Sequence, residues 1–281
     1  MVAAVVVLFN PDVDVATNMS SYIDCVDKVY IIDNSKFSNN SLFEALPFKH
    51  KLEYVFNNNN LGIAKALNIG CELAIQENMQ WALTMDQDSK FLNLNASVVT
   101  EVLERENSSV VLYYPNYLIG GIVYDKYVKE NNEPIVVMTS GNFINLNAYQ
   151  SLAGFDDKLF IDYVDIDYCL KLKAAGYKMA LLPHATLVHE LGNSKHVTFL
   201  SLKAIVTNHS SLRRYYITRN RLYICKKYKT VSAVFSKTEK RIFFNDILKI
   251  VLFEDDKISK LKSVINGYLD YRNNKFGMYN Q

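Results

Sequence analysis

The sequence predicts an α/β fold with a mostly parallel sheet, because strand-like and helix-like segments alternate along its first 90 residues. Val2–Phe9 is a continuous apolar run, which is typical of a strand buried on both faces. Gly62–Asn78 instead repeats its apolar residues at the spacing of a helix. Strands that alternate with helices in this way favour a parallel sheet with helices on both faces.

Each predicted element has a place in this order. The first half contains, in chain order, a strand at Val2–Phe9, a helix at Asp14–Cys25, strands at Lys28–Asp33 and Lys51–Phe56, a helix at Gly62–Asn78 and a strand at Gln80–Met85. After Pro115 the pattern is weaker. It predicts strands at Val136–Thr139, Lys178–Leu182 and Thr186–His189 and helices at Asn145–Ala153 and Asp165–Ala175. From Lys195 onward we expect helices.

Charge divides the 281 residues into two unequal parts. Residues 1–194 carry ten more acidic than basic side chains, whereas residues 195–281 carry twelve more basic than acidic ones. We therefore expect one large domain at 1–194 and a basic helical region at 195–281. The acidic part suits cation chemistry, and the basic part suits an anionic partner.

Signals for export or membrane insertion are weak. The apolar run at the N-terminus is short and lacks a basic leader, so it indicates a strand and not a signal peptide. The longest apolar candidate, Ile242–Phe253, is interrupted by polar residues and is too short to span a bilayer. The four cysteines are far apart and form no CxxC pair. We expect free thiols and a cytoplasmic protein.

Polar residues follow four of the predicted strands, and ligands of such sheets bind at this edge. They are Asn10, Asp33, Asn57–Asn60 and Asp86–Asp88. Asp86 and Asp88 lie two residues apart, so an extended chain points both carboxylates to one side. Hard oxygen ligands of this kind suit Mg²⁺ or Mn²⁺, which can in turn hold substrate phosphates. Haloacid-dehalogenase-type phosphatases also place an Asp-x-Asp after a strand, but normally after the first, whereas here it follows the fourth.

Three further features are candidates for a site. Gly62 at a helix start allows close backbone approach, although an Asn-rich loop that caps the helix would explain it too. Asp162, Asp165 and Asp167 cluster at another helix start, where the helix dipole explains one acid better than three. One of them could serve as a general base. His189 ends an apolar strand, although a single histidine is usually structural.

The segment from 203 to 229 contains eight Lys and Arg residues and no acid, interleaved with tyrosines. A solvated amphipathic helix would be the simplest explanation, but the charge is unusually one-sided. Nucleic acid is disfavoured because the body of the protein is acidic. Anionic phospholipid headgroups or a substrate diphosphate fit better.

Taken together, these segments resemble glycosyltransferase family 2, with the GT-A fold, and most of all its bacterial rhamnosyltransferase branch. The resemblance extends from about residue 2 to 228. It rests on "VVVLFNP", "VYIIDNS", "NNLGIAKALNIG", "WALTMDQDS", "SGNFI", "GFDDKLFIDYVDIDYCLKL", "HELGNS" and "RRYYITRNRLY". It implies transfer of a sugar from a nucleotide-sugar donor to an acceptor hydroxyl, with inversion and with the help of Mg²⁺ or Mn²⁺.

The resemblance also implies roles for individual residues, and it makes residues 1–90 the nucleotide-binding half and 91–194 the acceptor half. Asp165 corresponds to the catalytic base, although Val164 precedes it where many relatives have a Glu. The other implied roles are nucleotide binding by Asn10, Pro11, Asp33, Asn60, Gly62, Asn68 and Asp86, metal binding by Asp86, Asp88 and His189, and acceptor binding by Ser140, Gly141, Asn142, Asp162 and Asp167.

For function, the resemblance implies dTDP-L-rhamnose as the donor and a lipid-linked or growing glycan of a bacterial surface polysaccharide as the acceptor. We expect the basic segment 203–229 to contact that lipid diphosphate or the anionic inner face of the membrane, and no nucleic acid. Three alternatives stay open: another nucleotide-sugar, a non-catalytic relative that only binds nucleotide-sugar, and the phosphatase.

Overall fold

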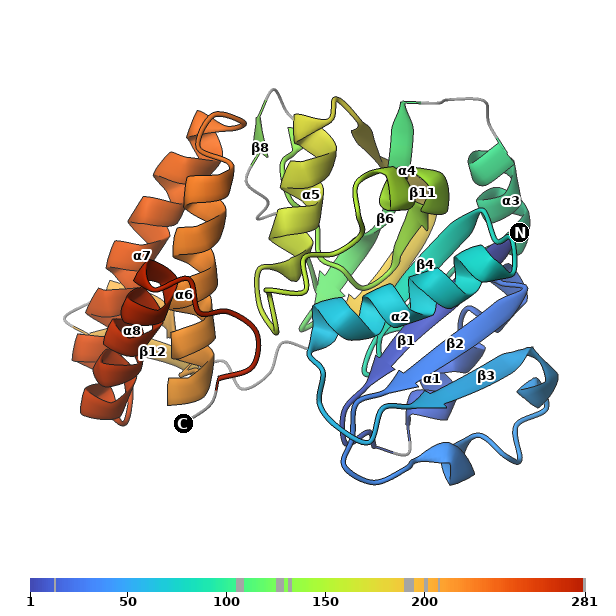
Figure 1. The fold of residues 1–281 in the computed structure, drawn as a ribbon, viewed down its shortest axis with the longest axis horizontal. Helices are drawn as coiled ribbons and strands as arrows, with labels where there is room; N and C mark the ends of the chain where they lie inside the picture. The colour runs from blue at the N-terminus through green and yellow to red at the C-terminus, as the bar shows by residue number, and fades with distance from the viewer. Residues whose placement is uncertain are drawn as a thin grey trace.

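A nine-stranded sheet runs through the body of the protein, and helices cover both of its faces (Figure 1). The C-terminal helices stand together at one side of this α/β body (Figure 1). The computed structural model describes residues 1–12, 14–104, 109–124, 129–130, 133–189, 195–199, 202–206 and 208–279.

Four parallel strands form the first half of the sheet, in the order β3-β2-β1-β4. Their predicted positions are confirmed to within one residue. β1 is apolar along its whole length and mostly buried, as expected for a strand with helices on both sides. The bounds are Val2–Leu8 for β1, Lys28–Asp33 for β2, Leu52–Phe56 for β3 and Trp81–Asp86 for β4.

The second half of the sheet has mixed strand directions. β10 runs antiparallel between β4 and β6, β11 runs parallel to β6, and β5 lies antiparallel to β11 at the edge. The α/β class is thus confirmed, with the strictly parallel order confined to the first half. The bounds are Lys90–Asn93 for β5, Val110–Ile119 for β6, Ile122–Val123 for β7, which pairs with β6, Lys129–Glu130 and Glu133–Pro134 for the small β8-β9 pair, Asn142–Asn145 for β10 and Lys178–His189 for β11.

One strand prediction in this half is wrong, and two others are parts of a single strand. Residues 136–139 form no regular element. The two strands predicted on either side of Pro183 are one strand, β11, whose register with β6 shifts between Leu181 and Thr186. A proline cannot donate to the ladder, and an irregularity at this place lets the strand continue beyond it. β6 was not predicted from the sequence for the same reason, because Pro115 lies inside it.

Two apolar cores sandwich the sheet. One face is covered by α1, the 3₁₀ turn η1 and α3, and the other by α2, α4 and α5. The bounds are Val15–Ser20 for α1, Ile23–Cys25 for η1, Ile63–Gln76 for α2, Ala96–Glu104 for α3, Leu146–Ser151 for α4 and Val164–Ala174 for α5, with further 3₁₀ turns η2 at Asn40–Leu42 and η3 at Lys49–Lys51.

The C-terminal region begins with a strand pair, so the expectation of helices from Lys195 onward is wrong for this part. β12 and β13 pair antiparallel, as their β-branched residues favour. Three helices follow. α6 and the start of α7 join the core that contains α2 and α5, and α8 packs against α6. In the part of the chain that the structure describes, no helix has the length and apolarity to cross a bilayer. The bounds are Lys195–Phe199 for β12, Leu202–Val206 for β13, Ser211–Lys227 for α6, Ala233–Phe253 for α7 and Lys257–Arg272 for α8.

Candidate active site

The carboxyl ends of β1, β2 and β4 meet at one edge of the sheet. Register pairs Leu8 with Asp33 and Val7 with Asp86, so the residues after these strands are neighbours. The amide of Gln87 joins two of the ends, because it accepts from the Phe9 N–H at 2.8 Å and donates to the Phe9 carbonyl at 3.3 Å. The Asp86–Asp88 loop is therefore tied directly to the end of β1.

Asp33 is fully buried and accepts four hydrogen bonds. They come from the backbone N–H of Ser35, the backbone and side-chain amides of Asn39, and the hydroxyl of Tyr54. Burial pushes the pKa of Asp33 upward, but these hydrogen bonds outweigh it and hold the pKa below its ordinary value. Asp33 is an anion that shapes the loop from 35 to 39, while Asn10 donates its N–H to Ser35 at 2.7 Å.

Gly62 allows a close approach, and the group that approaches is a carbonyl of the protein itself. A Cβ at Gly62 would lie 2.5 Å from the carbonyl oxygen of Phe160, and Gly62 has a φ of +85°. Ile63, the first residue of α2, donates its N–H to that same carbonyl at 2.8 Å. The start of α2 therefore fixes the loop before α5, and Asn60 supports it by accepting from the Gly62 N–H at 3.0 Å.

The side chain of Asn68, a residue expected to bind nucleotide, is engaged within the protein. It is buried, and both ends of its amide are occupied. Its oxygen accepts from the Tyr149 hydroxyl at 2.6 Å and the Phe155 N–H at 2.9 Å, and its nitrogen donates to the Phe155 carbonyl and to Asp157. The amide fastens α2 to the loop that follows α4.

The segment Ser140–Asn142 supports Asp86 from behind. Ser140 is buried and accepts from the Asp86 N–H at 3.1 Å, and Gly141 donates its N–H to Thr84 at 2.7 Å. Asn142 is buried too, and its amide bonds with the Met138 carbonyl and the Tyr117 hydroxyl. These three residues were expected to bind the acceptor, but their contacts hold β4 and β10 together.

The two acids in the first turn of α5 point in different directions. Residues two apart on a helix are about 200° apart around its axis, so Asp165 and Asp167 cannot face the same cavity. Asp165 lines a large cleft beside the C-terminal helices, whereas Asp167 is fully buried and accepts from Lys227 at 2.7 Å and from the Tyr228 hydroxyl at 2.9 Å. Asp167 thus anchors the end of α6, and its role in acceptor binding stays a prediction.

This cleft has a volume of about 560 Å³ and brings the remaining acids together with the C-terminal helices. One wall contains Asp86, Asp162 and Asp165. The opposite wall comes from α6, α7 and the residues just before them, and its polar members are His209, Arg213, Arg214, Arg221, Asp246 and Lys249. The cleft is large enough for a nucleotide-sugar. It brings acidic side chains from residues 1–194 together with basic side chains from residues 195–281.

Asp165 has the electrostatics of a general base. Burial raises its pKa, the negative charges of Asp162 and Asp86 raise it further, and the total brings the pKa to about 6 although the Ile166 N–H lowers it. A carboxyl with a pKa near neutrality is ionised at pH 7 and still basic enough to take up a proton. Opposite it, burial and nearby arginines lower the pKa of His209 to about 4, so this imidazole is neutral.

The turn before Asp165 is strained, and α6 and α7 hold it in place. Asp162 and Tyr163 both have positive φ, of 63° and 69°, which is costly for a tyrosine. Asn220 on α6 donates to the carbonyls of Ile161 and Asp162, at 2.8 and 3.0 Å. The buried Tyr163 hydroxyl donates to Glu239 and accepts from Arg221. The C-terminal helices therefore position Asp165 by holding the turn that precedes it.

We expect Tyr163→Phe to destabilise the fold by about 1–3 kcal/mol, because it leaves a buried hydrogen-bonding network short of one partner. Urea unfolding measures this as a lower midpoint with an unchanged slope. Tyr268→Phe is the matched control, since the Tyr268 hydroxyl is exposed and, among the described residues, accepts from Arg272 alone. Equal midpoints for Tyr163→Phe and the wild type would contradict this role of the hydroxyl.

The basic segment 203–229 is engaged within the protein. On α6, Arg213 pairs with Asp162, Arg214 with Glu254, and Lys227 with Asp156 and Asp167. Arg219 is fully buried beneath aromatic rings. The one-sided charge of this segment is thus balanced by acids from elsewhere in the chain, which leaves few of its cations for an external anionic surface.

The side chains expected to bind metal are placed as follows. Asp86 is half-buried in the cleft, Asp88 is exposed in the turn after β4, and the backbone of His189 ends β11 beside Ile119. The His189 side chain and residues 190–194 lie outside the described residues. Among the described side chains, no three His, Cys, Asp or Glu residues gather as a metal cage. Mg²⁺ seldom uses such a cage, because it binds one or two carboxylates together with substrate phosphates and water.

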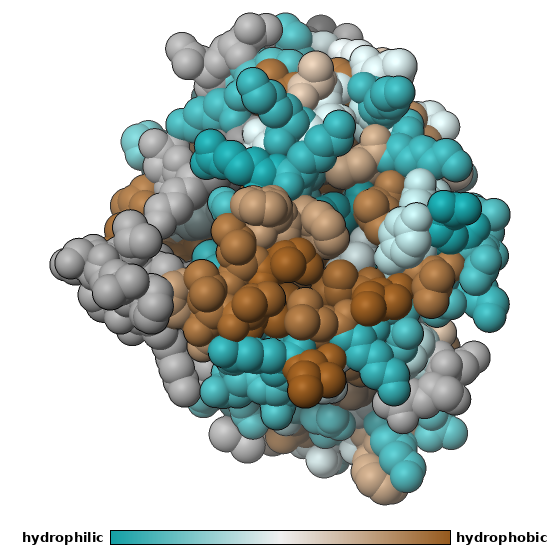
Figure 2. Space-filling view, turned by 90° about the vertical axis from the view of Figure 1, so that its left-hand side faces the viewer, coloured by the Kyte–Doolittle hydropathy of each residue, from teal (hydrophilic) through white to brown (hydrophobic). Residues whose placement is uncertain are grey.

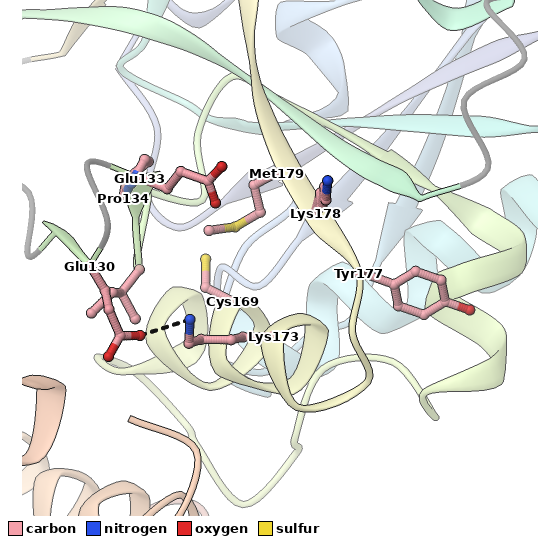
Figure 3. A pocket seen from close by; sticks show the side chains of 9 residues that line it. Glu130, Glu133, Pro134, Cys169, Lys173, Tyr177, Lys178 and Met179 are labelled. Atoms are coloured by element: carbon pink, nitrogen blue, oxygen red, sulfur yellow. Dashed lines mark ion pairs between the residues drawn. The ribbon is translucent and has the colours of Figure 1, made fainter. Parts of the chain in front are cut away.

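A second cavity lies on another side of α5 (Figure 3). Its volume is about 90 Å³, which is too small for a nucleotide-sugar. Lys173 and Glu130 point toward one another across it and form an ion pair of 2.8 Å (Figure 3). A substrate of that size would need the larger cleft, which is therefore the candidate site.

The family of this protein follows from a comparison with known protein families. The model of the family described as Glycosyl transferase family 2 matches residues 15–159, slightly more than half of the chain. The chain belongs to glycosyltransferase family 2. It is accordingly a glycosyltransferase, and the matched segment includes β2, α2, β4 and the Asp86–Asp88 loop.

Similarity to individual proteins reaches beyond that segment. A dTDP-rhamnosyl transferase, RfbF of Shigella flexneri, is 27% identical over 286 residues, which cover 95% of this chain and 94% of the relative. Among solved structures, GalNAc-T7 with UDP, GalNAc and Mn²⁺ has a TM-score of 0.57 at 13% identity, over 80% of this chain and 47% of that one. S. aureus TarS 1–349 in complex with UDP-GlcNAc has a TM-score of 0.59 at 15% identity, over 96% and 80%. These two show that this family 2 enzyme has the GT-A fold.

The sequence indicated no role for four residues of α6 and α7 that hold the turn before Asp165 or line the cleft. They are Asn220, Arg221, Glu239 and Lys249. Eight cations without an acid between 203 and 229 were a usable signal, because buried cations require acids from other parts of the chain. This signal could not identify the acids, because the partners of Arg213 and Lys227 lie 51 or more residues away from them in the sequence.

Proposed function

We propose that this glycosyltransferase moves L-rhamnose from dTDP-L-rhamnose to a hydroxyl of a surface-polysaccharide acceptor, with inversion. Its similarity to a dTDP-rhamnosyl transferase extends over 95% of the chain and so includes both walls of the cleft. The observation that carries the proposal is the half-buried Asp165, with a pKa raised to about 6, in the same cleft as Asp86.

In this proposal, Asp165 takes the proton from the acceptor hydroxyl as that hydroxyl attacks the anomeric carbon. General-base assistance of this kind contributes roughly 10²- to 10⁴-fold to the rate. Attack from the face opposite the leaving diphosphate inverts the anomeric carbon. The strained turn at Asp162 and Tyr163, held by Asn220, keeps the carboxylate of Asp165 directed into the cleft.

The donor's nucleotide is assigned to the edge formed by Asn10, Pro11, Asp33, Asn60 and Gly62, with Asp86 beside the ribose. Asp33 and Gly62 act through the loops that they shape, because their own hydrogen-bonding groups are occupied by the protein. The acceptor is assigned to the side of Asp162, where Arg213 and Lys249 supply positive charge for a lipid-linked phosphate. The lysine makes no ion pair with any described residue, so its ammonium group is available.

Mg²⁺ or Mn²⁺ fits the oxygen ligands of Asp86 and Asp88, with His189 as a further candidate. A divalent cation there would neutralise charge that develops on the leaving diphosphate. The chain's own contribution is to hold the loop that carries the two carboxylates, through the Gln87 amide on one side and Ser140 on the other. GalNAc-T7, a structural neighbour, was crystallised with Mn²⁺.

A thermal-shift screen of nucleotide-sugars tests the donor. We expect dTDP-L-rhamnose to raise the Tm, and more so with Mn²⁺, because a ligand at 100 times its Kd stabilises the folded state by about 2.7 kcal/mol. UDP-GlcNAc and dTDP-glucose serve as comparisons. A shift with UDP-GlcNAc alone would overturn the rhamnosyl assignment, and donor binding without transfer to any acceptor would support the non-catalytic alternative.

A further inference from the structure

The outward side of α7 and α8 carries large apolar side chains that the protein leaves uncovered. Their exposed fractions range from 43% at Leu248 to 86% at Ile258. We call this surface the α7–α8 face. It consists of Phe244, Leu248, Val251, Leu252, Ile258, Ile265, Tyr268 and Leu269.

Helical spacing places these residues opposite the sides that are already packed. On α7 the buried residues are Phe235, Glu239 and Ile250, and the exposed apolar residues lie on the other side of the helix. On α8 the inner side is pressed against α6, since a Cβ at Gly267 would lie 2.6 Å from the Tyr215 carbonyl. Neither helix can turn to bury its outer stripe without giving up these contacts.

The exposed apolar residues form one band. Figure 2 shows brown side chains that run without a break across the side of the molecule where the C-terminal helices lie, with teal side chains above and below. Monomeric soluble proteins rarely expose large contiguous apolar patches without a binding partner. A partner for this band is therefore expected.

The charges beside the band indicate which partner. The exposed cations on and just after α7 and α8 form no ion pair with any described residue. Most cations of α6, in contrast, are paired with an acid. Exposed acids in the same part of the chain are confined to Asp255 and Asp256, because the other acids are partly or fully buried. The exposed cations are Lys237, Lys240, Arg241, Lys257, Lys262, Arg272 and Lys275.

We propose that the α7–α8 face docks on an anionic lipid surface. Amphipathic helices with an apolar side and flanking lysines lie in the boundary between headgroups and acyl chains, where both features are satisfied. A second copy of the chain fits less well, because a symmetric contact would bring two cationic borders together. The inference relies on this face alone and not on the identity of the donor sugar.

Vesicle flotation of the full chain tests the proposal. The vesicles contain phosphatidylcholine with one quarter phosphatidylglycerol, and pure phosphatidylcholine vesicles serve as the comparison. We expect binding to the anionic vesicles that weakens with salt, and a loss of roughly tenfold or more in the triple variant Phe244→Gln, Leu248→Gln and Ile265→Gln. Ile122→Gln, which changes an isoleucine 74% exposed on β7, is the matched control and should bind normally.

A spectroscopic reporter makes the result independent of flotation. Trp81 is the protein's single tryptophan and is buried in β4, so Phe244→Trp adds one exposed indole. Its emission should shift to the blue with anionic vesicles, and that of Ile122→Trp should not. Absence of binding, or equal binding by the triple variant, would overturn the proposal. So would a dimer in sedimentation velocity that the triple variant dissociates, since this would assign the face to a second copy.

Discussion

Asp165→Asn is expected to lower kcat by roughly 10²- to 10⁴-fold while the affinity for the nucleotide-sugar stays nearly the same. The substitution keeps the shape of the side chain and removes only its ability to take a proton from the acceptor. Asp165 lines the cleft but makes no ion pair with any described residue, so the surrounding structure should be preserved. Initial rates with saturating acceptor, together with donor-induced thermal shifts, measure the two quantities separately.

The pH dependence provides an independent check on the same residue. Because a general base must be ionised, kcat/KM of the wild type should fall as the pH drops through about 6. A divalent cation near Asp86 would lower the pKa of Asp165, so the midpoint should lie at or below that value. The residual rate of Asp165→Asn should show no such fall, and a persistent fall would assign the ionisation to another group.

Asp165→Asn should stabilise the folded protein above about pH 6, although it lowers the activity. Burial raises the pKa of Asp165 above its unfolded value, so the folded state holds this proton more tightly. The corresponding stabilisation is present at low pH and is lost as the pH rises through about 6. Asp165→Asn should therefore raise the Tm at pH 8 and change it little at pH 4. A lower Tm at pH 8 would mean that the variant is inactive for structural reasons.

Asp88→Ala is expected to lower the rate at least about 100-fold, because metal-ion stabilisation of a leaving diphosphate is worth several kcal/mol. The donor's thermal shift should also lose its dependence on Mn²⁺. Asp88 is exposed in the turn after β4, so the fold does not rely on burying it. Rates and thermal shifts measured across a range of Mn²⁺ concentrations separate a weakened metal site from a lost catalytic group.

The matched control for Asp88 is Asp24→Ala, which removes an exposed carboxylate from η1, outside the cleft. Its rate and its Mn²⁺ dependence should equal those of the wild type. Full activity of Asp88→Ala, or the same loss in both variants, would contradict the assignment of Asp88 as a metal ligand.

Much of the fold was readable from short segments. An apolar run such as Val2–Leu8 is typical of a strand covered on both sides, and the helical spacing of α2 leaves one buried face. The carboxyl ends of such strands meet by geometry, so Asn10, Asp33 and Asp86 could be grouped from the order of the strands alone. β11 was predicted as two separate strands and β12 as part of a helical region, because a proline or a short β-branched run is ambiguous without its neighbours.

Which acids could act on a substrate depended on the three-dimensional arrangement. The sequence alone indicated the α/β class, the Asp86–Asp88 pair, the acids before and within α5, and the separation of acidic and basic halves. Only the folded chain distinguished Asp165 in the cleft from Asp167 beneath Lys227, and only it paired the cations of α6 with distant acids. The reason is physical: strand and helix periodicity are local properties of the chain, whereas burial and charge pairing depend on residues far apart in sequence.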